Sequence, residues 1–227
     1  MNTNKRTARV AGFLYLIVAI TAFFADNFVR KSLIVPGDAS ATAHNIMSSG
    51  CLFRIGFVSD LIMTTCWILL ALTLYVLFKS VNKNYALLMV SFVLVGSAIT
   101  CINSLNQFAA LLVLNGADYL RVFGTEQLQA LAMLFLDLCK HGIVIASIFF
   151  GLWLFPLGYL VIKSGFIPRI LGILLIIAGL GYLIDFFTFY LFPNFNVTFT
   201  PFTFWGELLL LLWLMIKGVK DDKELVA

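Results

Sequence analysis

Charged side chains are scarce in this chain. Asp, Glu, Lys and Arg together make up 11% of its 227 residues, against roughly 25% in a typical soluble domain. Hydrophobic residues reach 62%, and the mean hydropathy is +1.02. A water-soluble fold of this size cannot hide so much apolar surface. The composition therefore predicts one integral membrane domain over residues 1–227, with no separate soluble domain.

Metal-binding and redox motifs are also lacking. Cys51, Cys66, Cys101 and Cys139 stand singly, without the paired spacing of a zinc or disulfide exchange site. The two histidines are far apart, and no H-E-x-x-H motif occurs. No metal is predicted, and the sequence identifies no cofactor. The net charge of +4 is interpreted as a topology signal, so no nucleic-acid partner is expected.

Long apolar segments dominate the remainder. A bilayer core needs about 20 predominantly apolar residues per helix, and six segments approach that length. They are roughly Val10–Ala25, Ile55–Phe78, Tyr85–Leu114, Met133–Tyr159, Ile170–Leu191 and Phe202–Ile216. The fold class predicted is an all-α integral membrane bundle of six transmembrane helices.

Basic residues predict the direction of these spans. Ten of them fall on the side of the N-terminus: Lys5, Arg6, Arg9, Lys79, Lys83, Lys163, Arg169, Lys217, Lys220 and Lys223. Four fall on the opposite side: Arg30, Lys31, Arg54 and Arg121. Because Lys and Arg concentrate in cytoplasmic segments, both termini are predicted to lie in the cytoplasm.

The two outer loops of most interest are the first and the last. In the first, predicted to run from Asp26 to Arg54, Asp38 can cap a short helix over Ala39–Ser49 that ends at Gly50. We expect this extracytoplasmic helix to lie at the membrane interface. The last loop, Phe192–Pro201, lies in a stretch rich in Phe. Either an aromatic belt at the headgroups or a hydrophobic lid over a ligand would explain it.

Polar side chains inside the spans indicate a site, because such residues are costly in hydrocarbon and are commonly functional. Counting from the inner basic residue of each span places Asp60, Asn103, His141 and Asp185 at about 24 to 33 Å, and Glu207 at about 15 Å. The predicted ligand-binding set is Arg54, Asp60, Asn103, Asn106, Gln107, Asp137, Lys140, His141, Asp185 and Glu207.

Charge pairing within this set is expected. Asp137 and Lys140 are three residues apart, so they can pair on one helix face. Asp60, Asp185 and Glu207 have no opposite charge nearby on their own helix, and Arg54, Lys140 and Arg30 are their candidate partners. From the first outer loop, Arg30 and His44 are placed to close the site.

A one-sided polar site favours the binding or sensing of an amphiphilic small molecule from the outer leaflet or the periplasm, with membrane lipid as the surrounding partner. Two alternatives remain. Histidines and carboxylates would serve a metal-dependent intramembrane hydrolase, and Glu207 with Asp185 would serve a small ion-coupled transporter. The sequence favours a protein that is not an enzyme, without deciding the matter, and leaves the oligomeric state open.

Several short motifs along the whole chain carry a family resemblance. They are Ala8-Arg9-Val10-Ala11-Gly12, Leu33-Ile34-Val35-Pro36-Gly37-Asp38, Phe53-Arg54-Ile55-Gly56 with Asp60-Leu61, Pro168-Arg169-Ile170-Leu171-Gly172, Gly179 to Asp185, and Gly206-Glu207 with Trp213, Lys217 and Gly218. With these motifs the chain resembles a family of small multi-span bacterial inner-membrane proteins known only as a domain of unknown function. The resemblance implies a plasma-membrane location in bacteria and supplies no catalytic residues.

Overall fold

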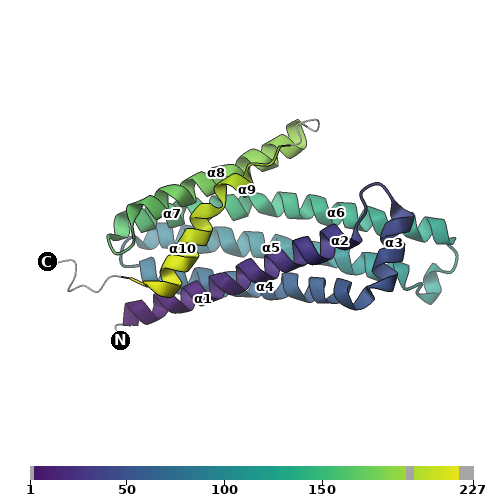
Figure 1. Cartoon of the computed structure of the whole chain (residues 1–227), viewed down its shortest axis with the longest axis horizontal. Coiled ribbons are helices and arrows are strands. Elements are labelled where there is room, and N and C mark those ends of the chain that lie inside the picture. The colour runs from purple at the N-terminus through teal and green to yellow at the C-terminus, as the bar shows by residue number, and fades with distance from the viewer. Residues whose placement is uncertain (1–2, 193–196, 220–227) are drawn as a thin grey trace. The chain divides into compact units, whose positions relative to one another are not determined.

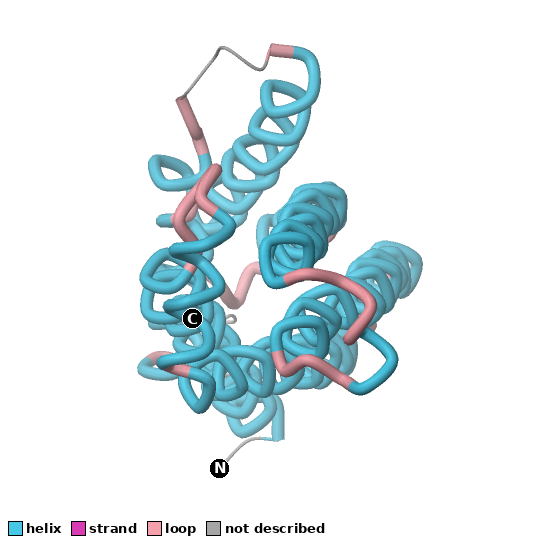
Figure 2. The backbone as a smooth tube through the Cα atoms, turned by 90° about the vertical axis from the view of Figure 1, so that its right-hand side faces the viewer, coloured by secondary structure: helices cyan, strands magenta, loops and turns pink. Residues whose placement is uncertain are grey.

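The computed structural model describes residues 3–192 and 197–219, and every regular element within them is a helix (Figure 1). Figure 2 shows these helices joined by short loops. Lys220 and Lys223, which were counted for the topology prediction, lie outside the described residues. The chain forms two compact units. Unit 1 comprises Met1–Ile17, Cys66–Ser97 and Val144–Ala227, and unit 2 comprises Val18–Thr65 and Ala98–Ile143.

Among the described residues, five helices are long and apolar enough to cross a membrane. They are Asn4–Leu33, Gly50–Phe78, Lys83–Leu114, Thr125–Ser164 and Arg169–Leu191. The sixth predicted span corresponds to a shorter apolar helix, Thr200–Ile216. This helix comprises α9 (Thr200–Thr203) and α10 (Trp205–Ile216). The helices are those of a multi-pass membrane protein.

The first helix continues beyond its predicted end. α1 (Thr3–Phe23) runs into a π-helix, η1 (Phe24–Arg30), and then into α2 (Lys31–Leu33). The prediction of a loop beginning at Asp26 is therefore wrong. The polar side chains that suggested a loop instead support the helix across successive turns, since Lys31 Nζ bonds Asn27 Oδ1 at 2.9 Å and Asp26 Oδ2 at 2.8 Å.

The short helix predicted to follow Asp38 is present. α3 spans Ala39–Ser48, and the Asp38 side chain accepts a hydrogen bond from the Ala41 amide at 2.8 Å, the N-cap geometry that the sequence predicts. Gly37 precedes this cap with a φ of 79°, a conformation that glycine adopts without strain. α4 (Gly50–Phe78) follows after Ser49. Placement of α3 at a membrane interface stays a prediction.

A proline divides the fourth long helix in unit 1. α6 (Thr125–Leu152) ends at Leu152, and α7 (Leu154–Ser164) begins after Trp153. Pro156 has no amide hydrogen to donate to the carbonyl four residues earlier, so the ladder is broken there. The flanking bonds, from Trp153 N to Phe149 O and from Leu157 N to Trp153 O, are both 3.3 Å long.

Glycines bring α7 and α8 (Arg169–Leu191) into close contact in unit 1. A Cβ atom built on Gly172 would lie 2.5 Å from the Gly158 carbonyl oxygen, and one built on Gly158 would lie 2.7 Å from that of Gly172. The C-terminal end of α6 repeats this arrangement, because a Cβ atom built on Gly151 would lie 2.8 Å from the Gly179 carbonyl oxygen. Small residues at such crossings allow membrane helices to gain van der Waals contact.

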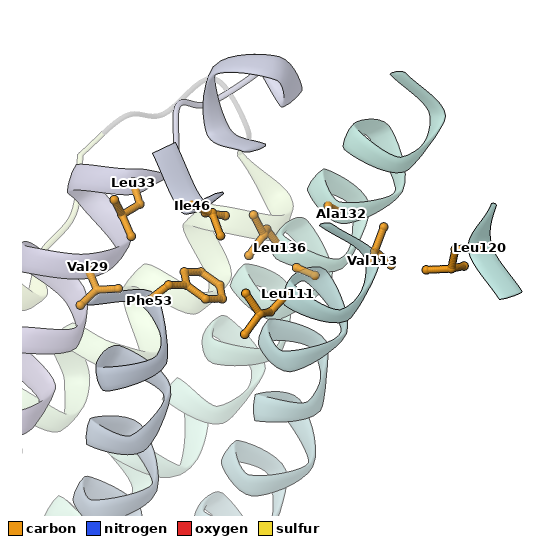
Figure 3. Packing of buried hydrophobic residues seen from close by; sticks show 10 residues of the cluster. Val29, Leu33, Ile46, Phe53, Leu111, Val113, Leu120, Ala132 and Leu136 are labelled. Atoms are coloured by element: carbon orange, nitrogen blue, oxygen red, sulfur yellow. The ribbon is translucent and has the colours of Figure 1, made fainter. Parts of the chain in front are cut away.

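Unit 2 has its own apolar core (Figure 3). It joins η1, α2, α3, α4, α5 (Lys83–Leu114) and the start of α6, with Leu120 added by the short 3₁₀ helix η2 (Asp118–Leu120). Val29, Leu33, Ile46, Phe53, Leu111, Val113, Leu120, Ala132 and Leu136 point into it. Polar side chains of the predicted site follow this core by one to two turns along α4 and precede it along α5.

Candidate functional site

An ion pair joins the π-helix to α4 in unit 2. Arg30 Nη1 bonds Asp60 Oδ2 at 2.7 Å, and Asp60 is only 7% exposed. Gly56, one turn before Asp60, permits this approach: a Cβ atom there would lie 2.6 Å from Val29 Cγ1. The pairing of Asp60 with Arg30, one of its candidate partners, is thus confirmed, although Arg30 comes from a helix and not from a loop.

Two further charged residues, Asp26 and Lys31, join this ion pair, and the positive and negative charges are equal in number. Arg30 Nε lies 3.7 Å from Asp26 Oδ1, and Lys31 Nζ lies 2.8 Å from Asp26 Oδ2. The network therefore joins two carboxylates to two cations. Asp26 and Arg30 both belong to η1, and π-helical turns occur frequently at functional sites.

Amide side chains of α5 extend the polar region toward α6. Asn103 Nδ2 donates to the Cys139 carbonyl at 2.8 Å and lies 3.7 Å from its Sγ. Asn106 Nδ2 donates to Asn103 Oδ1 at 3.1 Å. Gly142 leaves the room that this arrangement needs, because a Cβ atom at that position would collide with the Asn103 side chain.

Gln107 lies one turn beyond Asn103 on the same face of α5 and is 3% exposed. Its Nε2 is buried and has no hydrogen-bond partner among the described residues. Cys139 Sγ lies beside Asn103, and the Phe57 ring of α4 lies 5.6 Å from the Phe108 ring of α5, so Asp60 and Gln107 lie at a similar level of the unit. We call Arg30, Asp60, Asn103, Gln107 and Cys139 the polar layer of unit 2.

Other residues of the predicted set lie elsewhere on unit 2. Asp137, Lys140 and His141 occupy exposed positions on α6, Arg54 is exposed on α4, and His44 is exposed on α3. The structure therefore brings Asp60, Asn103, Asn106 and Gln107 into one region with Arg30. A role for the exposed residues in ligand binding stays a prediction.

Glu207 in unit 1 is bound by tyrosines. Tyr15 Oη donates to Glu207 Oε2 at 2.5 Å, and Tyr182 is a second side-chain hydrogen-bond partner of this carboxylate. Rings pack behind both tyrosines, with Trp153 at a centroid distance of 5.9 Å from Tyr15 and Phe150 at 6.3 Å from Tyr182. The carboxylate thus ties together α1, α8 and α10.

Asp185 has a different set of partners in the same unit. Its carboxylate accepts from the Phe199 amide at 2.6 Å, the Thr200 amide at 2.8 Å and the Thr200 hydroxyl at 2.6 Å. These bonds fix the start of α9 on α8. Residues 193–196 of the predicted aromatic loop lie outside the described residues. Pairing of Asp185 or Glu207 with a cation from Arg54, Lys140 or Arg30 stays a prediction.

Sequence reasoning missed three features of these regions. Tyr15 and Tyr182 looked like ordinary members of apolar spans, although a phenol flanked by small and aliphatic residues in a span can bond a distant carboxylate. Cys139 belongs to no sequence motif, so its contacts with Asn103 had no signal in the sequence. The π-helix had no separate signal beyond a run of polar residues spaced three to five apart.

The described residues contain no group of three or more His, Cys, Asp and Glu that could hold a metal ion.

Comparison with known proteins covers most of the chain. A family model described as "Domain of unknown function (DUF4386)" matches residues 10–218. An uncharacterized protein of Archaeoglobus fulgidus is 34% identical over 152 residues, which are 66% of this chain and 75% of that protein. No solved structure matches the chain. The resemblance drawn from the sequence is confirmed, and the protein belongs to the DUF4386 family.

Proposed function

We propose that this protein binds or senses an amphiphilic molecule of the outer leaflet or the periplasm, and that the polar layer of unit 2 is the binding site. The observation that carries this proposal is Gln107 Nε2, a buried donor without a partner among the described residues. It lies in the same layer as a nearly buried ion pair. A layer that served packing alone would be expected to satisfy this group.

Energetics support a role beyond packing. Leaving a buried donor unpaired costs about 1 to 3 kcal/mol, which is a large part of the net stability of a domain. A side-chain hydrogen bond between membrane helices contributes only about 0.6 kcal/mol to stability on average. A ligand that supplies the missing acceptor would recover the lost interaction, and the binding site would be preorganised by the ion pair and by Asn103.

The proposed topology has six spans with both termini in the cytoplasm of a bacterium, in its plasma membrane, and with α3 at the outer interface. A helix over Thr200–Ile216 is about 25 Å long at 1.5 Å per residue, near the roughly 30 Å of a bilayer core. Lys217 and Gly218 directly follow it. Snorkelling of the Lys217 side chain would make up part of the difference.

Native mass spectrometry of the protein purified in mild detergent tests the binding site. We expect a bound molecule of lipid-like mass in the wild type and its loss in the double variant Arg30→Met/Asp60→Leu. Removing both charges avoids the uncompensated buried charge that either single change would leave. The proposal would be contradicted if the wild type carried no bound molecule, or if the double variant retained the molecule fully.

Native cysteines offer a test of the topology. Cys51 is exposed at the start of α4, so a membrane-impermeant maleimide should label it in intact cells. Cys51→Ser should abolish this labelling, because Cys101, although exposed on the helix surface, is predicted to face lipid. Labelling only after permeabilisation would reverse the proposed direction. A C-terminal reporter found outside the cell would reduce the number of spans to five.

A further inference from the structure

We infer that the group of the ligand that enters the polar layer is an uncharged carbonyl oxygen, received by the side-chain amide of Gln107. The inference rests on the proposed function, since it names the chemistry of the molecule bound at the same site. It follows from three properties of the layer: the kind of atom left unpaired, the balance of charge, and the depth of Gln107 along α5.

The unpaired atom is a donor. Gln107 Nε2 carries two amide hydrogens and has no partner among the described residues, whereas neighbouring Asn103 and Asn106 each donate to an oxygen. A buried N–H group is satisfied only by an acceptor. The ligand must therefore present an oxygen or an equivalent lone pair, and an apolar chain or an ammonium group would leave Gln107 as it is.

The charges of the layer favour a neutral acceptor. Arg30 is already bonded to Asp60 at 2.7 Å, and Lys31 to Asp26 at 2.8 Å, so the two cations are matched by two carboxylates. An anionic ligand would bring a third negative charge beside Asp60. Burial of a charge without a counterion is strongly unfavourable. A carbonyl oxygen satisfies the amide and leaves this balance unchanged.

Depth points to the same chemistry. Gln107 is 24 residues from Lys83, and Asn103 is 20 residues from it, or about 36 Å and 30 Å along a helix. With Lys83 at the inner side, Gln107 would lie at the outer edge of a hydrocarbon core of about 30 Å. Acyl ester carbonyls of lipids lie at that boundary. A membrane-dissolved quinone carries the same kind of oxygen and is the second source to distinguish.

Matched lipids test the inference. The delipidated full-length protein in detergent is mixed with a diacyl phosphatidylglycerol, with its dialkyl ether analogue, or with a short-chain ubiquinone, and its unfolding temperature is measured. The two lipids share headgroup and chain length, but only the diacyl lipid carries ester carbonyls. At about 100 times Kd the favoured probe should raise the unfolding temperature by about 5 to 10 °C. Stabilisation by the diacyl lipid over the ether, or by the quinone, supports a carbonyl and identifies its source.

Gln107→Leu completes the test. This variant removes the unpaired amide at nearly constant volume, so without ligand it should be at least as stable as the wild type. The response to the carbonyl-bearing probe should disappear. Gln129→Leu is the matched control, because Gln129 is half-buried on α6 of the same unit, and it should respond like the wild type.

The outcomes separate this inference from the proposed function. Equal stabilisation of the wild type by ester and ether lipids, with no response to quinone, would overturn the carbonyl while leaving amphiphile binding intact. A ligand-free Gln107→Leu protein that is clearly less stable than the wild type would also overturn it, since the amide would then have a structural partner. If no probe stabilises the wild type and native mass spectrometry finds no bound molecule, the proposed function itself fails.

Discussion

The two units of this membrane protein deal with buried carboxylates in different ways. In unit 1, Asp185 and Glu207 are satisfied by hydroxyl and backbone donors, five bonds that link helices to one another. In unit 2, Asp60 is satisfied by a cation, Arg30, within a layer whose Gln107 amide stays unpaired among the described residues. The comparison separates carboxylates that fasten a fold from polar groups that are still able to accept a ligand.

Unpaired atoms alone do not make this distinction. Unit 1 also holds buried atoms without a partner among the described residues, Ser97 Oγ and Trp213 Nε1. Neither takes part in the hydrogen bonds of Asp185 or Glu207. What sets unit 2 apart is that its unpaired amide lies in one layer with a charge network that is already neutral.

The largest effect is expected from Arg30→Ala. Loss of the guanidinium leaves Asp60 as an uncompensated buried charge, which should lower the free energy of unfolding by about 3 to 5 kcal/mol. Titration with SDS in mixed micelles measures this quantity. Arg54→Ala, which removes an exposed cation from the same region, should stay within about 0.5 kcal/mol of the wild type. Similar losses for both variants would show that the ion pair contributes no special stability.

Tyr15→Phe examines the corresponding carboxylate of unit 1. It removes a hydrogen bond to a buried carboxyl group and should cost about 1 to 3 kcal/mol by the same titration. Glu207 keeps Tyr182 as a partner, so the loss should be smaller than that of Arg30→Ala. Tyr85→Phe serves as the control, because Tyr85 is 40% exposed. A loss larger than that of Arg30→Ala would reverse the order of the two carboxylates.

Gly172→Ala tests the close contact between α7 and α8, the helix that holds Asp185. The added methyl group would lie 2.5 Å from the Gly158 carbonyl oxygen, so α7 and α8 must separate, at about 1 to 3 kcal/mol. Nothing lies within 4 Å of a Cβ atom built on Gly50, and Gly50→Ala is therefore expected to be neutral. Equal stability of the two variants would contradict the close contact.

The smallest effect is expected from Asp185→Ala. Loss of a side chain that caps a helix start costs about 0.5 to 2 kcal/mol, and here α9 has only four residues. Hydrogen exchange should become faster at the amides of Phe199 and Thr200, because both donate hydrogen bonds to the Asp185 carboxylate in the wild type. The amide of Ala41, bonded to Asp38, should exchange at the wild-type rate. Unchanged exchange at Thr200 would argue against the cap.

Much of this arrangement is readable from the sequence because it depends on local patterns. Apolar length predicts the five long helices, and Asp38 after Pro36-Gly37 predicts the start of α3. Helical spacing places Asn103 and Gln107 on one face of α5, and the shortage of cations limits the partners of Asp60 to few residues, of which Arg30 is one. Here periodicity and charge counting suffice.

Two features escape such reasoning for physical reasons. A hydropathy pattern predicts that the first span ends before Asp26, because it counts each side chain separately. The contacts of Lys31 with Asp26 and Asn27 stabilise the helix beyond that point. Tyr15 meets Glu207 across 192 residues of sequence, a contact set by packing that no local pattern encodes. For the same reason, a search for cations could not find the partners of Glu207.

The central claim is that the unit 2 layer holds a ligand while the unit 1 carboxylates hold the fold. Native mass spectrometry of two single variants, Gln107→Leu and Glu207→Gln, compares the units directly. We predict that the bound amphiphile is lost from Gln107→Leu and retained by Glu207→Gln, whose amide oxygen still accepts from Tyr15. Retention by Gln107→Leu together with loss from Glu207→Gln would contradict the claim and move the binding site to unit 1.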